Sequence, residues 1–155
     1  MSDPAPSPKT RRTGPRYSAT GFIVYAECYG RAAWRTQAAG GLPHNAPVGT
    51  LAVHCAELAL KAVLLKQGRR AQDLKRLGHD LSAIFEATGI TWEVVGLTPL
   101  ELNFWSDAVK STTMRYMDSE LYYVIESSQA VSFMEKLFHY CLEVVLPGAQ
   151  RSLRH

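Results

Sequence analysis

Residues 51–81 read LAVHCAELALKAVLLKQGRRAQDLKRLGHDL, and the fold of the chain is best predicted from this segment. Apolar side chains surround nearly the whole circumference of its first half, residues 51–65, which is the pattern of a helix at the centre of a domain. Glu57 and Lys61 interrupt that pattern one helical turn apart. Because an unpaired charge is costly to bury, these two side chains are expected to be paired or to serve a function.

The remainder of the chain predicts further helices and no strand. We expect long helices over about residues 20–38 and 47–67, and a helical turn within the basic connector at residues 71–77. A short helix should start at His79 or Asp80, either of which can cap exposed amides of a first turn. The sequence Thr98-Pro99-Leu100-Glu101 predicts another helix, to about residue 110.

The last helix is expected to begin near Asp118 or Ser119, to be the longest, and to end before Pro147. Short connections between long helices favour antiparallel neighbours. The predicted fold is therefore all-α, an up-and-down bundle of about five helices built on the first, second and last. Residues 19–147 would form this bundle, with a disordered arm at residues 1–18 and a flexible tail at residues 148–155.

The net charge of +3 comes from the N-terminal arm. Residues 1–18 hold four basic side chains and one acidic one, so the rest of the chain carries 13 of each sign. Four prolines interleaved with Ser, Thr and basic residues cannot build a packed element. The arm could contact nucleic acid through its positive charge, or it could serve only to keep the protein soluble.

The composition argues against membrane, metal and disulfide roles. The chain shows neither an apolar run of about 20 residues nor an apolar leader, so we expect a cytoplasmic protein without membrane association. The three cysteines, Cys28, Cys55 and Cys141, fall in apolar helical patterns and are expected to be reduced core residues. The paired Glu-x-x-His pattern of di-iron bundles is absent, and no metal or cofactor is predicted.

Three short segments carry a resemblance to a known family. They are AELALKAVL at residues 56–64, GHDL at 78–81 and MRY at 114–116. In this order and spacing the chain resembles the HEPN family of small helical domains over roughly residues 20–145. The resemblance implies a helical bundle that commonly dimerises. It also implies a setting of RNA cleavage, nucleotide binding and toxins that are partnered with small nucleotidyltransferases.

One departure from the family pattern bears on catalysis. HEPN ribonucleases resemble one another in an Arg that is followed, after four to six residues, by a His. Here Arg76 precedes His79 by only three residues. Arg151 precedes His155 by four, but this pair lies within the predicted tail. The usual ribonuclease site is therefore not expected. A ribonuclease with a non-standard pair of Arg76 and His79 is kept as an alternative.

Another group of polar residues suits an anionic ligand. Lys61 and Arg115 would hold phosphate, and Glu57 or Asp80 would orient His79. Tyr116 would stack on a base. The predicted ligand-binding residues are Glu57, Lys61, Asp80, Arg115 and Tyr116. The structural alternative is that Asp80 only caps its helix, Arg115 neutralises Glu57, and the cluster holds loops to the core.

The sequence thus predicts a homodimer that binds RNA or a nucleotide, beside a nucleotidyltransferase-type or toxin–antitoxin partner. The competing prediction is a structural or protein-interaction module without a ligand. The two differ in geometry. A ligand site predicts that Lys61, His79 and Arg115 face a shared open cleft, whereas a structural cluster predicts that they are paired and closed.

Overall fold

The computed structural model of the chain describes residues 17–42, 45–110 and 126–155, and all regular structure in these ranges is helical. The helices are α1 (Ala19–Ala39), α2 (Ala46–Lys66), α3 (Ala71–Leu77), α4 (Leu81–Thr88), α5 (Pro99–Lys110) and α6 (Ser127–Val145). The predicted all-α bundle is confirmed. The turn expected within the basic connector is the short helix α3.

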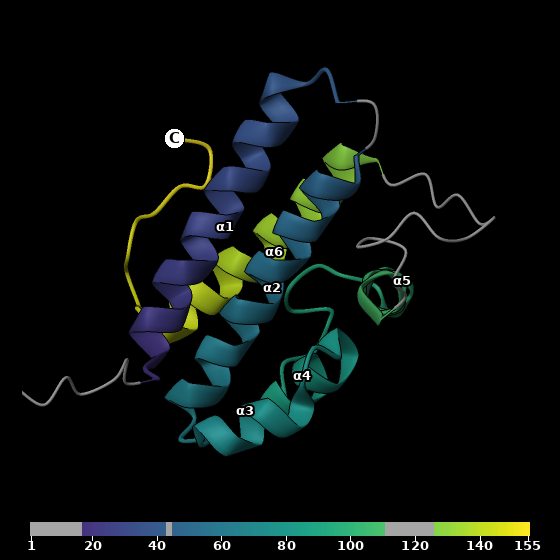
Figure 1. The fold of residues 1–155 in the computed structure, drawn as a ribbon. Coiled ribbons are helices and arrows are strands. Elements are labelled where there is room, and N and C mark those ends of the chain that lie inside the picture. Colours follow the sequence, from purple (N-terminus) through teal and green to yellow (C-terminus); the bar gives the residue numbers. More distant parts are fainter. Residues whose placement is uncertain (1–16, 43–44, 111–125) are drawn as a thin grey trace, which may run out of the picture.

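Three long helices form the body of the bundle (Figure 1). α1 and α2 pack as an antiparallel pair, and α6 packs against both while running in the same direction as α2. The short helices α3 and α4 cover the end at which α2 finishes, and α5 packs against α4 and α2. The candidate site lies at this end of the molecule.

α2 is the central helix, as its apolar circumference predicts. Thirteen of its 21 residues are buried, including Glu57 and Lys61. By length and composition it could also cross a membrane, but 72% of that stretch is buried inside the bundle. Such burial is typical of the core helix of a helical domain.

Polar side chains fix the starts of two short helices where the sequence predicts them. Asp80 caps α4 and accepts a hydrogen bond from the Ala83 amide at 3.1 Å. At α5 the Thr98 amide donates to the Glu101 carboxylate at 2.9 Å, and the Glu101 amide donates to the Thr98 hydroxyl at 3.2 Å. This reciprocal arrangement is a capping box.

The last helix differs from its prediction. α6 begins at Ser127, after Glu126 in an extended conformation, and its 19 residues make it shorter than α1 and α2, which have 21 each. The start predicted near Asp118 or Ser119 lies outside the described residues.

Residues 148–155, which the sequence predicts to be a flexible tail, are instead packed against the bundle, and we name them the C-terminal strap. Leu153 is buried, and a Cβ atom at Gly30 would lie only 2.8 Å from it. Arg151 pairs with the buried Glu27 at 2.5 Å, and Arg154 pairs with Glu135 at 3.2 Å. Figure 1 shows the strap returning along α1.

Only two of the three cysteines lie in the core. Cys55 and Cys141 are buried, and burial raises the pKa of both thiols well above its usual range. Cys28 is exposed on α1, so its expected core position is wrong. It falls on the face of α1 that turns away from α2 and α6. The apolar pattern of the sequence did not distinguish this face from the buried one.

Candidate functional site

Glu57 and Lys61 form a closed ion pair on α2. The Lys61 Nζ atom lies 2.6 Å from Glu57 Oε1 and donates a second hydrogen bond, of 2.7 Å, to the Gly78 carbonyl oxygen. Their side chains are 4% and 11% exposed. The pair thus ties the middle of α2 to the turn between α3 and α4, which is the arrangement expected of a structural role.

His79 is held by the same carboxylate but faces outward. Its Nδ1 atom lies 2.9 Å from Glu57 Oε1 and 3.1 Å from Oε2, and its side chain is 62% exposed. Because the ionised carboxylate can only accept, Nδ1 carries the hydrogen. Glu57 therefore fixes the orientation of the imidazole and leaves the second ring nitrogen, Nε2, free of this contact.

Asp80 has a local role. Besides capping α4, its Oδ1 atom accepts a hydrogen bond from the Ser106 hydroxyl at 3.2 Å. Ser106 in turn accepts from the Ser82 amide at 3.2 Å. These bonds join α4 to α5, so Asp80 acts as a capping residue, while the Glu57 carboxylate contacts the His79 ring.

A shallow cleft of about 280 Å³ opens beside His79. Its walls come from the start of α1, from α2 and from α3, and they combine aromatic, basic and apolar groups: Tyr17, Phe22, Lys61, Ala71, Leu74, Lys75, Gly78 and His79. Tyr17 is 57% exposed and its ring lies 5.7 Å from that of Phe22. Lys75 is exposed and has no ion-pair partner in the part of the chain that the structure describes. We name this hollow the His79 cleft.

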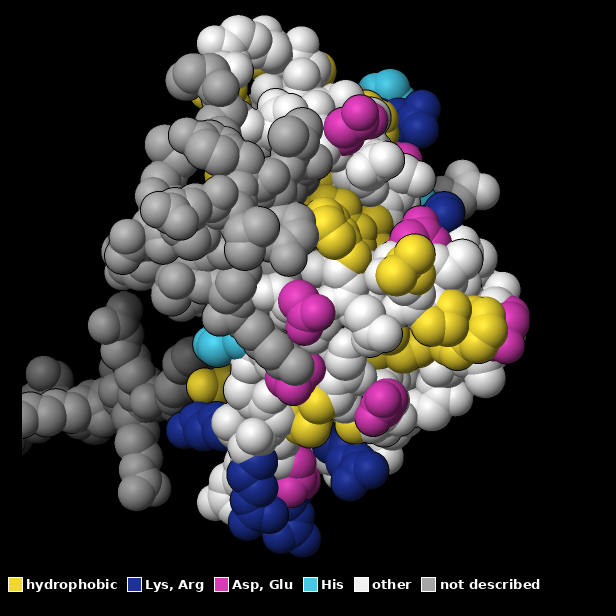
Figure 2. Space-filling model, turned by 90° about the vertical axis from the view of Figure 1, so that its right-hand side faces the viewer, with side chains coloured by type: hydrophobic (Ala, Val, Ile, Leu, Met, Phe, Trp, Pro, Cys, Tyr) yellow, Lys and Arg dark blue, Asp and Glu magenta, His cyan; other side chains and the backbone are white. Residues whose placement is uncertain are grey.

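Basic side chains gather around this end of the molecule. Five exposed Lys and Arg residues fall within eleven positions, accompanied by one carboxylate, that of Asp73; they are Lys66, Arg69, Arg70, Lys75 and Arg76. Figure 2 shows Lys and Arg side chains gathered at the lower end of the face it displays, the end that α3 covers in Figure 1. We call these five residues the basic end. It is a local concentration of positive charge on a body that is neutral in sum.

The predicted catalytic pair is not brought together. Arg76 is 82% exposed on its side chain, lies 3.9 Å from Asp73, and lines a different hollow of about 300 Å³ between α3 and α4. His79 lines the cleft on the other side of α3. Of the predicted ligand-binding set, Glu57, Lys61 and Asp80 are placed as described above. Arg115 and Tyr116 lie outside the described residues.

Sequence reasoning missed three groups of the cleft, the exposed Tyr17 and Lys75 and the partly buried Phe22. Tyr17 follows directly on the basic arm, and Lys75 belongs to the basic connector. The clustering of basic residues was therefore a signal in the sequence near both positions. Their meeting with His79 depends on how α1 and α3 pack on α2, which no local signal specifies.

Neither a metal-binding cluster among the described residues nor a related protein identifies the site. Within the described ranges no group of three or more His, Cys, Asp or Glu side chains is placed to hold a metal ion. Comparison of the chain with protein-family models, with curated proteins and with solved structures found no match. The resemblance to the HEPN family therefore stays a prediction from the sequence.

Proposed function

We propose that this protein binds single-stranded RNA along its basic end, with the His79 cleft holding one nucleotide of the strand. The observation that carries the proposal is the outward-facing His79, held by a buried Glu57 at a cleft that also presents Lys75 and Tyr17. Exposed cations beside an exposed aromatic ring suit a phosphate backbone and a stacked base.

The size of the cleft favours a strand over a free small molecule. Pockets for drug-sized ligands range from about 300 to 1,000 Å³, and the His79 cleft of about 280 Å³ lies below that range. It is suited to part of a longer ligand. The other basic residues, Arg69, Arg70 and Arg76, would then contact phosphates on either side of the cleft.

The proposal does not require cleavage. Arg76 and His79 line different hollows, whereas general acid–base chemistry and charge stabilisation at one phosphate need convergent groups. His79 is assigned a binding role, in which it donates or accepts a hydrogen bond at Nε2.

The test is binding of a fluorescently labelled single-stranded oligoribonucleotide, followed by anisotropy at several salt concentrations. Wild-type affinity should fall with salt, and Lys75→Gln should weaken binding and lower the slope of log K against log salt by about 0.7. His79→Ala should weaken binding with little change in the slope. The RNA recovered afterwards should run intact on a gel.

Arg35→Gln is the matched control, because Arg35 is also exposed but lies near the opposite end of the bundle, in the last turns of α1. It should leave binding unchanged. Equal losses from Arg35→Gln and Lys75→Gln would contradict a defined site. RNA fragments that depend on His79 would instead support the ribonuclease alternative.

The second candidate function is a protein-interaction module without a nucleic-acid ligand. The observation in its favour is the closure of Lys61, whose ammonium is occupied by Glu57 and the Gly78 carbonyl. It predicts no salt-dependent RNA binding at all, so the same anisotropy experiment separates the two.

The homodimer implied by the family resemblance is also a proposal. Exposed apolar side chains on α1, Val24 at 38% and Tyr25 at 65%, are compatible with such a contact. Sedimentation equilibrium should give a mass twice that of the 17.2 kDa chain, and a single-chain mass would contradict it.

A further inference from the structure

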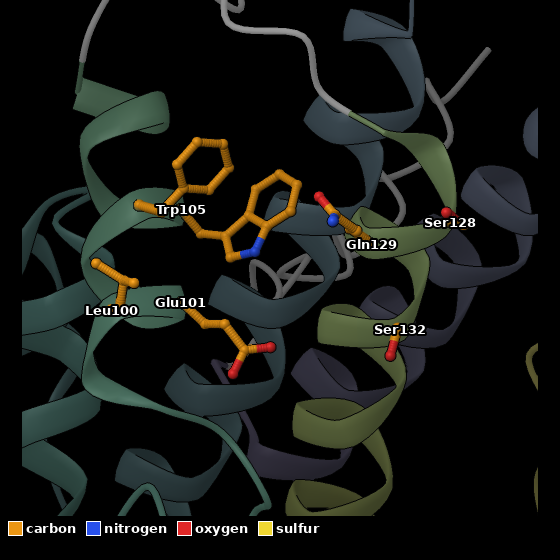
Figure 3. A pocket seen from close by; sticks show the side chains of 7 residues that line it. Leu100, Glu101, Trp105, Ser128, Gln129 and Ser132 are labelled. Atoms are coloured by element: carbon orange, nitrogen blue, oxygen red, sulfur yellow. The ribbon is translucent and has the colours of Figure 1, made fainter.

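A larger pocket, of about 510 Å³, lies between α5 and α6 and shares no lining residue with the His79 cleft (Figure 3). Helix α5 supplies its apolar wall and one carboxylate, and α6 supplies hydroxyl and amide groups: Leu100, Glu101, Phe104 and Trp105 face Ser128, Gln129 and Ser132. We name it the α5–α6 pocket. Its volume falls within the range of sites for small organic ligands.

Trp105 gives this pocket a fixed, unused donor. The residue is only 3% exposed, and its ring stacks on that of Phe133 at 5.3 Å and 23°. No described residue accepts a hydrogen bond from Trp105 Nε1, and this nitrogen is not one of the buried polar atoms left without a partner, so its N–H is open to the pocket that the residue lines. Figure 3 shows the indole between the two helices, with its nitrogen on the side toward Glu101 and the Gln129 amide extending toward the ring.

The charge of the lining restricts the ligand. None of the described lining residues is Lys or Arg, and Glu101 is the ionisable one among them, with the Lys136 ammonium 3.7 Å from its Oε1 atom. Burial would raise the Glu101 pKa, but hydrogen bonds from Thr98 and the positive charge of Lys136 together lower it. The carboxylate is therefore ionised at neutral pH and disfavours phosphates and other anions.

We propose that the α5–α6 pocket binds an uncharged planar nitrogen heterocycle, whose ring nitrogen accepts a hydrogen bond from Trp105 Nε1–H. One flat face of the ligand would lie against Leu100. Polar edge groups of the ligand would meet the Gln129 amide and the Ser132 hydroxyl. This inference is independent of RNA binding, because it uses a different face of different helices.

Three probes of one shape test the proposal: isoquinoline, naphthalene, which lacks the ring nitrogen, and isoquinoline-5-sulfonate, which is an anion. The readout is the ¹H–¹⁵N resonance of the Trp105 indole, assigned with Trp34→Phe and Trp92→Phe variants. Isoquinoline should shift this resonance saturably. Naphthalene should bind roughly 2- to 10-fold more weakly, as expected for one lost hydrogen bond, and the sulfonate should not bind.

Pocket-filling variants supply the controls. Ser132→Phe should abolish the isoquinoline shift, whereas His139→Phe, the same side chain at another exposed position of α6, should retain it. Gln129→Ala provides a second pocket variant if Ser132→Phe fails to fold by circular dichroism, and it should weaken binding. No saturable shift, equal binding of the sulfonate, equal binding of naphthalene, or a shift that survives the pocket variants would overturn the proposal.

Discussion

Among single residues, Glu57 is a side chain that joins helix α2 to the turn between α3 and α4. Its carboxylate accepts from Lys61 and from His79 while it is almost fully buried. Removing one partner of a buried ion pair costs more than removing both, because the remaining charge is left without compensation. The same carboxylate thus serves both stability and the orientation of His79.

We predict that Glu57→Gln lowers the free energy of unfolding by about 3–5 kcal/mol, since it leaves the Lys61 ammonium buried beside a neutral group. Urea denaturation followed by circular dichroism measures this change. The double variant Glu57→Gln with Lys61→Met should recover part of the loss. A double variant less stable than the single one would show that the ion pair does not control stability here.

The cysteines differ in accessibility, and thiol labelling should report it. Because Cys55 and Cys141 are buried and their pKa values are raised by burial, their reactive thiolate forms are scarce in the folded protein. We predict that a disulfide reagent such as Ellman's labels one thiol rapidly in native protein and three after denaturation. Cys28→Ser should remove the rapid phase, and rapid labelling of all three in wild type would contradict the buried positions.

Among the helices, the capping box of α5 makes the stability of the fold depend on pH. Burial opposes ionisation of Glu101, but the hydrogen bonds from Thr98 and the charge of Lys136 prevail, so its pKa is lower in the folded state. The unfolded chain therefore takes up the proton first on acidification. Glu101 stabilises the fold above its unfolded pKa, and this contribution is lost as pH falls through the folded pKa.

We accordingly predict that wild type is more stable than Glu101→Gln at neutral pH and that the difference shrinks below about pH 5, where free Glu begins to protonate. Urea denaturation at a series of pH values measures the gap. Lys136→Gln, which removes the nearby cation, should narrow the neutral-pH gap. A gap that stays constant down to low pH would rule out a role for the charge.

At the scale of the whole molecule, the C-terminal strap joins helices that are far apart in sequence. Leu153 fills the space above Gly30, and Arg151 and Arg31 compensate the buried Glu27. Trp34 and Arg154 both bond Glu135 of α6, and the Arg154 guanidinium lies 4.7 Å from the Trp34 ring centre. The strap therefore belongs to the core that α1 and α6 build.

We predict that Leu153→Ala lowers the free energy of unfolding by about 2–5 kcal/mol, as for other buried leucines. The exposed Gln150→Ala is the control and should change it by less than about 0.5 kcal/mol. Urea denaturation compares the two. If Leu153→Ala were as stable as Gln150→Ala, the strap would contribute nothing to the core.

Local sequence signals predicted most of the helices and the starts of α4 and α5, but not the start of α6. Apolar periodicity located α1 and α2, and the side chains of Asp80 and Thr98 located α4 and α5, because capping and helical periodicity involve neighbours within one or two turns. The cost of burying charge likewise predicted that Glu57 and Lys61 are paired or functional, and the structure pairs them with each other.

The packing of the helices determines which groups from different elements meet. It placed His79 against Glu57, Tyr17 and Lys75 beside His79, and Leu153 against Gly30. Each of these contacts joins segments 4 to more than 100 positions apart and depends on how whole helices pack. Packing is set by the sum of many weak non-local contacts rather than by any one residue, so a linear pattern could predict the helices but not the cleft, the α5–α6 pocket or the strap.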